Sequence, residues 1–108
     1  MAIFEKIFCG DFDKILEKAE KAVMNRSISV QLKDKVDYCT KQGRCSIRVF
    51  ERYSFFDGRR VSMNMTLFQA GDEIFLCVVT AGGASGVFSL DESTWGEKAF
   101  LETLEDAL

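Results

Sequence analysis

The chain contains no histidine and no proline among its 108 residues. Without histidine, the chain cannot supply Ser-His-Asp or Cys-His catalysis, histidine-ligated zinc or the commonest general base near neutral pH. The absence of proline fits a compact unit with continuous strands. No recognised catalytic constellation remains, so the sequence assigns no catalytic residue and favours a non-enzymatic protein.

The spacing of the cysteines is not that of a metal site. None of the four cysteines belongs to a Cys-x-x-Cys pair, so we expect no structural zinc, no other metal and no cofactor. We expect all four thiols to be reduced, with Cys45 filling the core and Cys77 on the outer face of a sheet. A reactive thiol among them would need a lowered pKa.

Long apolar runs are also lacking. No stretch approaches the roughly 18 residues of a membrane-spanning helix, and the first residues do not resemble a signal peptide. The composition is 47% hydrophobic and 29% charged, which is typical of a soluble globular protein, and residues 1–108 are expected to form one domain. The net charge of −3 gives no reason to expect nucleic acid or an anionic membrane as a partner. We therefore expect a cytoplasmic protein.

The apolar pattern predicts a sheet with two helices. Four antiparallel strands are expected between residues 28 and 79, preceded by a strand over 3–8 and a helix from an Asp11 cap to about Met24. A short sixth strand is expected over 87–90, and a second helix begins at the capping box 94–97. The order β-α-β-β-β-β-β-α predicts an α+β two-layer sandwich, an antiparallel sheet of five to six strands with both helices on one face.

Turn lengths predict the register of these strands. A three-residue loop ending at Gly58 places Val49 opposite Met65, so that apolar residues coincide. Similar reasoning pairs Cys39 with Arg44 and, across a Gly71-Asp72 loop, Leu67 with Leu76. The predicted buried face comprises Ile28, Val30, Leu32, Val36, Ile47, Val49, Tyr53, Phe55, Val61, Met63, Met65, Leu67, Ile74, Leu76 and Val78.

An acidic residue interrupts this predicted inner face. Glu51 would point toward the helices, where a carboxylate must be paired, protonated or at the mouth of a cavity. Either Glu51 is in contact with water, because a local bulge turns it outward or because it lies at the end of the layer, or it faces a small ligand with Tyr53 beside it and Trp95 at the lip. The second alternative predicts a ligand-binding pocket between sheet and helices.

The predicted outer face is unusually apolar. It would carry Phe50, Phe68, Phe75 and Val79, with Arg48 and Arg52 at the rim. A contiguous apolar patch of this kind marks an interaction site unless another segment covers it. We expect either that the N-terminal strand or a loop covers the patch, or that a homodimer packs two sheets together through it.

Arginines spaced by four along one strand form the one feature typical of nucleic-acid binding. Arg44, Arg48 and Arg52 share a face, as every second residue of a strand does. No RNP-type motif accompanies them, and a charged, aggregation-resistant sheet face accounts for the arginines more simply. Nucleic acid is therefore not the expected partner.

Three segments resemble a small bacterial family of unknown function. They are the residues 44–56 (RCSIRVFERYSFF), 62–68 (SMNMTLF) and 81–86 (AGGASG), and the resemblance extends over the whole chain. The family brings no activity, cofactor or catalytic residue. The resemblance implies a free-standing bacterial domain, which leaves an interaction module that forms a homodimer, or a small-ligand-binding domain, as the expected functions.

Overall fold

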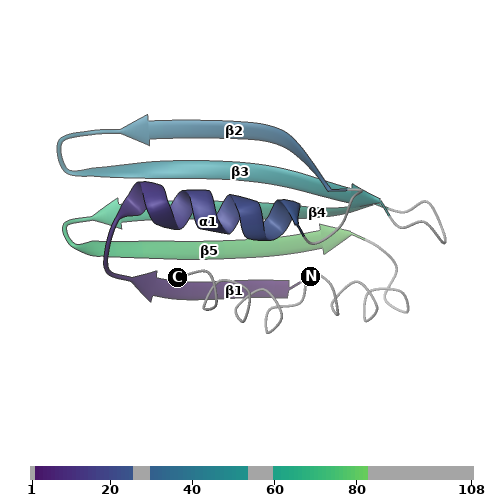
Figure 1. Ribbon diagram of the computed structural model, residues 1–108, viewed down its shortest axis with the longest axis horizontal. Coiled ribbons are helices and arrows are strands. Elements are labelled where there is room, and N and C mark those ends of the chain that lie inside the picture. The colour runs from purple at the N-terminus through teal and green to yellow at the C-terminus, as the bar shows by residue number, and fades with distance from the viewer. Residues whose placement is uncertain (1, 26–29, 54–59, 83–108) are drawn as a thin grey trace.

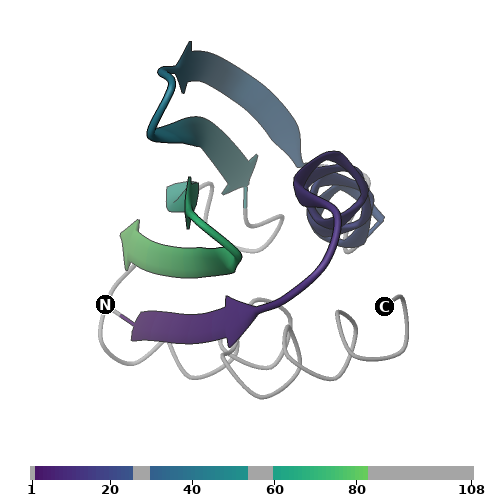
Figure 2. The same ribbon diagram turned by 90° about the vertical axis from the view of Figure 1, so that its left-hand side faces the viewer.

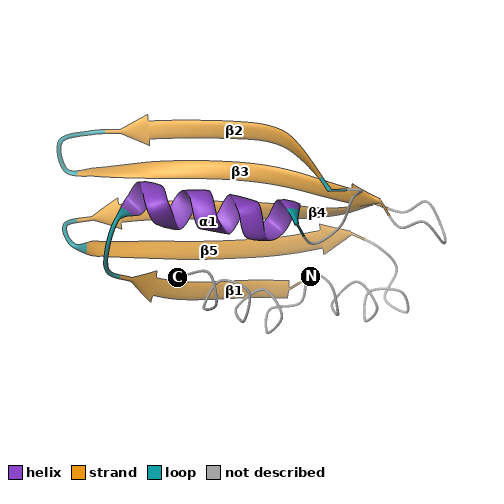
Figure 3. Ribbon diagram, in the orientation of Figure 1, coloured by secondary structure: helices purple, strands orange, loops and turns teal. Residues whose placement is uncertain are grey.

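The computed structural model describes residues 2–25, 30–53 and 60–82, which form one antiparallel sheet and one helix (Figures 1 and 3). The predicted antiparallel sheet is confirmed, whereas the predicted sixth strand and second helix lie outside the described residues. The elements in chain order are β1 (Ala2–Phe8), α1 (Phe12–Met24), β2 (Gln31–Cys39), β3 (Gly43–Tyr53), β4 (Arg60–Ala70) and β5 (Glu73–Gly82).

The sheet has five strands in the order β1-β5-β4-β3-β2. Strands β2 to β5 form a meander, and β1 adds to the free side of β5. The N-terminal strand is therefore part of the sheet and does not cover its outer face. Helix α1 connects β1 at one edge to β2 at the other and lies on one side of the twisted sheet (Figure 2). We call that side the inner face and the opposite side the outer face.

Helix α1 begins and ends where the sequence predicts. The Asp11 carboxylate accepts a hydrogen bond from the Lys14 backbone N–H at 3.1 Å, and Asn25 forms the C-cap. One stripe of the helix is buried in the common core with Phe50 of β3 and the inner side chains of β4 and β5. The buried residues of the helix are Phe12, Ile15, Ala19, Ala22 and Val23.

The predicted β4–β5 register is confirmed, and the predicted β2–β3 register is confirmed for residues 34–39 of β2. Cys39 pairs with Arg44 across the β2–β3 turn, and Leu67 pairs with Leu76 across the β4–β5 turn. Gly71 takes a φ of +60° at the first position of the two-residue β4–β5 loop, a conformation that glycine adopts without a steric penalty.

The predicted register between β3 and β4 is wrong by one residue. Tyr53 pairs with Arg60 rather than with Val61, and Met65 pairs with Arg48 rather than with Val49. A slip of one residue moves every side chain of a strand to the opposite face. The side chains of β4 and β5 therefore face as predicted, whereas those of β3 and of the regular part of β2 are reversed.

The reversal changes which side chains of β2 and β3 are buried. Ser46, Arg48, Phe50 and Arg52 are buried on the inner face of β3. The prediction that Phe50, Arg48 and Arg52 lie on the outer face is wrong, as is the prediction that Val36, Ile47 and Val49 lie on the inner face. A bulge between Leu32 and Asp34 shifts the β2–β3 register, and Leu32 remains 41% exposed. The predicted core residues Ile28 and Phe55 lie outside the described residues.

Gly43 allows β3 to approach β4 closely at the β2–β3 turn. A Cβ atom at this position would lie 2.5 Å from the Gln69 backbone oxygen. We expect Gly43→Ala to reduce the free energy of unfolding by about 1–3 kcal/mol, because the backbone of β3 or β4 must shift. Urea denaturation measures the loss, with Lys41→Ala in the same exposed turn as the control. Equal stabilities of the two variants would contradict the close approach.

Candidate functional site

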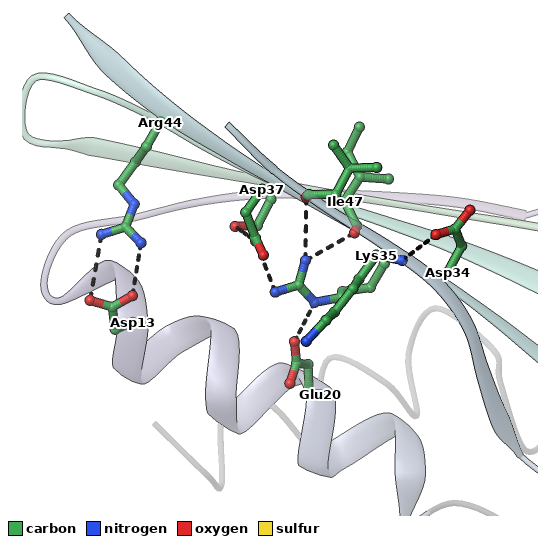
Figure 4. A network of polar contacts seen from close by, with 10 residues as sticks. Asp13, Glu20, Asp34, Lys35, Asp37, Arg44 and Ile47 are labelled. Atoms are coloured by element: carbon green, nitrogen blue, oxygen red, sulfur yellow. Dashed lines mark hydrogen bonds and ion pairs between the residues drawn. The ribbon is translucent and has the colours of Figure 1, made fainter. Parts of the chain in front are cut away.

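A buried arginine links the helix to the sheet. Arg48 points from β3 toward α1, and its side chain is only 6% exposed. Its Nε donates to Glu20 of α1 at 2.5 Å, and its Nη2 lies 2.9 Å from the Asp37 carboxylate of β2 (Figure 4). Its Nη1 donates to the backbone oxygens of Val36 and Ile47. The guanidinium thus holds two strands and the helix together.

The two carboxylates keep this guanidinium charged. Burial opposes the charged form of Arg48, but the hydrogen bonds to Glu20 and Asp37 outweigh burial and raise the pKa of Arg48. The Ser46 hydroxyl donates to Asp37 at 2.7 Å, and this bond, helped by Arg48, lowers the pKa of Asp37. With its charge balanced, Arg48 is suited to a structural role rather than to binding an anionic ligand.

A second arginine, Arg44, binds residues in the first turn of the helix. Arg44 donates to both oxygens of Asp13, at 2.8 and 3.4 Å, and its guanidinium lies 4.0 Å from the centroid of the Phe12 ring. Ion pairing and a cation–π contact therefore act together in the first turn of α1.

These contacts argue against a nucleic-acid surface. Arg44, Arg48 and Arg52 share one face of β3 as predicted, but that face is turned toward α1. The charges of Arg44 and Arg48 are neutralised by acidic residues, and Arg52 is buried. The stripe is therefore not presented to a phosphate backbone.

Among the predicted ligand-binding residues, only Glu51 has a described side chain, and it does not lie between the sheet and the helix. Glu51 alternates with the buried Phe50 and Arg52 and so lies on the outer face, where its Oε2 is 3.8 Å from Nη1 of Arg60. This Glu51 oxygen is buried and accepts no hydrogen bond within the described residues. The side chain of Tyr53 and all of Trp95 lie outside the described residues.

The outer face carries the apolar surface that the sequence predicts, but only some of its residues are the predicted ones. Nothing in the described part of the chain is layered on this face (Figure 2). One complete row across the five strands, read from the paired residues, is Ile7, Phe75, Phe68, Cys45 and Tyr38. The two neighbouring rows are Glu5, Cys77, Thr66, Ile47 and Val36, and then Ile3, Val79, Asn64, Val49 and Asp34.

Several of these side chains are open to solvent. Phe68 is 45% exposed, Val36 is 52% exposed and Tyr38 is 67% exposed. Tyr38, Cys45 and Phe68 also line a hollow of about 280 Å³ beside the β2–β3 turn. Of the predicted interface residues, Phe68, Phe75 and Val79 lie on this face. Sequence reasoning missed Val36, Tyr38 and Ile47 here, because the alternation of Val36 and Ile47 with charged residues predicts that they face the helices.

The remaining chemistry of the described residues is sparse. All four cysteines are free, and Cys45 lies on the outer face rather than in the core as predicted. Burial, helped by Glu5, raises the pKa of the Cys77 thiol and so disfavours its reactive thiolate. In residues 2–25, 30–53 and 60–82 no three acidic or cysteine side chains gather as a metal site would require, and no helix could span a membrane.

Comparison with solved structures supports the fold. A crystal structure of the hypothetical protein jhp0584 from Helicobacter pylori matches with a TM-score of 0.55 at 12% identity, over 94% of this chain and 83% of that one. The protein TTHA0849 from Thermus thermophilus matches with a TM-score of 0.38 at 9% identity, over 98% and 94% of the two chains. At such identities the first match is evidence for the fold alone.

Comparison of the sequence identifies the family. No curated protein matches this chain. The family model described as "Family of unknown function (DUF6054)" matches residues 1–108, as the sequence resemblance predicts. Because the match covers the whole sequence, the chain is a member of the DUF6054 family, whose function is unknown.

Proposed function

We propose that this protein is a non-enzymatic interaction module that self-associates through the outer face of its sheet. The observation that carries the proposal is the row of five apolar side chains that crosses every strand. A monomer that left this row in water would expose an unusually large contiguous apolar patch. Packing the same face of a second copy against it would remove both patches from water.

The size of the outer face suits a stable interface. The five strands have 7 to 11 residues each; at a spacing of about 4.8 Å and a rise of about 3.3 Å per residue they give a face of roughly 750 Å². Stable complexes bury about 800 Å² on each partner. Two such sheets would stack about 10 Å apart with their strands about 30° out of line, as in a β-sandwich. The hollow beside Phe68 and Tyr38 would receive an apolar side chain of the second copy.

Phe68→Lys tests this proposal. A lysine in the middle of the apolar row would lose its hydration in the interface. We therefore expect the protein concentration at which the variant associates to be at least tenfold higher. Light scattering during gel filtration, at concentrations from about 1 to 100 micromolar, measures the change.

Met24→Lys is the matched control. Met24 is also exposed, at 42%, but it lies at the end of α1 away from the outer face. This control should associate as the unaltered protein does. An unaltered protein that is monomeric at every concentration would overturn the proposal, as would equal association of Phe68→Lys and the control.

A further inference from the structure

Among the described residues, strand β2 pairs with β3 along one edge and with no strand along the other. It is an outermost strand of the sheet, and each of its nine residues is exposed (Figure 1). An exposed edge strand is a template for pairing with another strand, and proteins often block such edges with charges or bulges. The bulge between Leu32 and Asp34 interrupts only the first part of β2.

The remainder of β2 is regular, and alternate residues direct their backbone N–H and C=O groups away from β3, toward the unpaired edge. The Thr40 backbone N–H donates to the Gly43 oxygen at 2.7 Å, which marks this pair as hydrogen bonded. Because such pairs alternate along an antiparallel ladder, Lys35, Asp37 and Cys39 direct their backbone groups to the free edge. The Lys35 N–H accordingly does not reach β3 and donates instead to the Asp34 carboxylate at 2.8 Å (Figure 4).

We propose that this edge pairs antiparallel with β2 of a second copy, centred on Val36. In this register Lys35 lies opposite Asp37 of the second copy, and Asp37 lies opposite its Lys35. Both side chains are on the inner face, since their partners in β3 are the buried Arg48 and Ser46. Opposite charges that face each other across strands are stabilising.

Neighbouring registers are less favourable. A shift of two residues in one direction places Lys35 of one copy opposite Lys35 of the other. A shift of two residues in the other direction places the two Asp37 residues opposite each other. Like charges directly opposite each other destabilise a pair of strands. The charge pattern of β2 is therefore self-complementary around Val36, and this complementarity selects a second copy of the chain as the occupant.

The edge contact is independent of the outer face. Its two-fold axis is normal to the sheet and joins two five-stranded sheets into one, whereas outer faces pack about an axis in the plane of the sheet. Roughly four backbone hydrogen bonds would form between Lys35 and Asp37 of the two copies. The Asp34 carboxylate must leave the Lys35 N–H before the edges pair, so the contact should depend on protein concentration.

Cysteine cross-linking tests the register. Cys9, Cys39, Cys45 and Cys77 are first replaced with serine, and Val36→Cys is then introduced. Residues opposite each other at Val36 form a non-hydrogen-bonded pair with Cα atoms about 4.5 Å apart, which a disulfide can span. We expect most of the Val36→Cys protein to form a covalent dimer when treated with diamide at about 50 micromolar.

The controls use the next non-hydrogen-bonded pair of the proposed register, which is Asp34 of one copy and Tyr38 of the other. Asp34→Cys and Tyr38→Cys should each stay monomeric alone but cross-link when mixed, because Asp34 lies opposite Tyr38 of the second copy. Lys35→Glu should reduce the Val36→Cys cross-link at least fivefold, whereas Lys33→Glu, in the bulge, should not. A monomeric Val36→Cys, or cross-linking of all three single variants alike, would overturn the proposal.

One further variant separates this contact from the outer-face contact. Adding Phe68→Lys to Val36→Cys disrupts the outer face and leaves the β2 edge unchanged. The cross-link should persist if the edges pair independently. Loss of the cross-link would show that Val36 meets its copy only through the outer face, and the edge proposal would be wrong.

Discussion

Phe50→Ala is expected to reduce the free energy of unfolding by about 3–5 kcal/mol. Phe50 is 0% exposed and lies in the core with α1 and the inner residues of β4 and β5. Truncating a buried phenylalanine removes its transfer free energy and leaves a cavity, which together have this magnitude. Urea denaturation followed by circular dichroism measures the loss.

Phe68→Ala is the matched control. Phe68 lies one strand away on the outer face and is 45% exposed, so in dilute, monomeric protein we expect a loss below about 1 kcal/mol. The comparison decides between the two registers of β3. If Phe50→Ala were as mild as Phe68→Ala, Phe50 would lie on the outer face, β3 would face as its apolar alternation predicts, and the structural assignment would be wrong.

The features that depend on neighbouring residues were predictable from the sequence. Asp11 caps α1 because its carboxylate reaches the N–H of Lys14, three residues later. The Gly71-Asp72 loop fixes the β4–β5 register because glycine adopts a positive φ there. In both cases the residues that determine the structure are at most three positions apart in the sequence.

The orientation of β3 was not predictable by the same reasoning. Predicting register by placing apolar residues opposite each other assumes that one face of the sheet is buried and the other is exposed to solvent. Strand β3, however, has Ile47 and Val49 on one face and Phe50 on the other. Arg48 and Ser46 are accommodated on the inner face because Glu20 and Asp37 bond them there. Glu20 lies 28 residues away from Arg48 in the sequence, so no local pattern connects the two.

A weaker signal for this arrangement was present on the helix. Asp13 and Glu20 are seven residues apart on α1, which places them on one side of the helix about 10.5 Å apart. Arg44 and Arg48 are four residues apart on one strand face, about 13 Å apart. The two spacings are similar enough for two acid–arginine pairs, and the structure contains both pairs. Matching charges between elements would therefore have favoured the correct orientation of β3.

Because Arg48 is buried, the stability of the fold should also depend strongly on its two carboxylate partners, Glu20 and Asp37. The double variant Glu20→Gln, Asp37→Asn should lose about 3–5 kcal/mol of stability, because a guanidinium that is only 6% exposed would keep its charge without a carboxylate. Adding Arg48→Met removes that charge and should recover part of the loss. Glu17→Gln is the control, since the pair of Glu17 with Lys21 is exposed and its loss should not be measurable. An unchanged stability of the double variant would contradict the role of the network.

The pH dependence gives an independent measure of the Asp37 part of this network. Hydrogen bonds from Ser46 and Arg48 lower the pKa of Asp37 in the folded protein. A carboxyl group with a lowered pKa stabilises the fold above its unfolded pKa of about 3.9, and this stability is lost as the pH falls through the folded value. The difference between the unaltered protein and Asp37→Asn should therefore be complete at pH 6 and shrink below about pH 4. Urea denaturation at pH 2 to 7 measures this difference, and a constant difference across the range would show that the Asp37 charge does not contribute to stability.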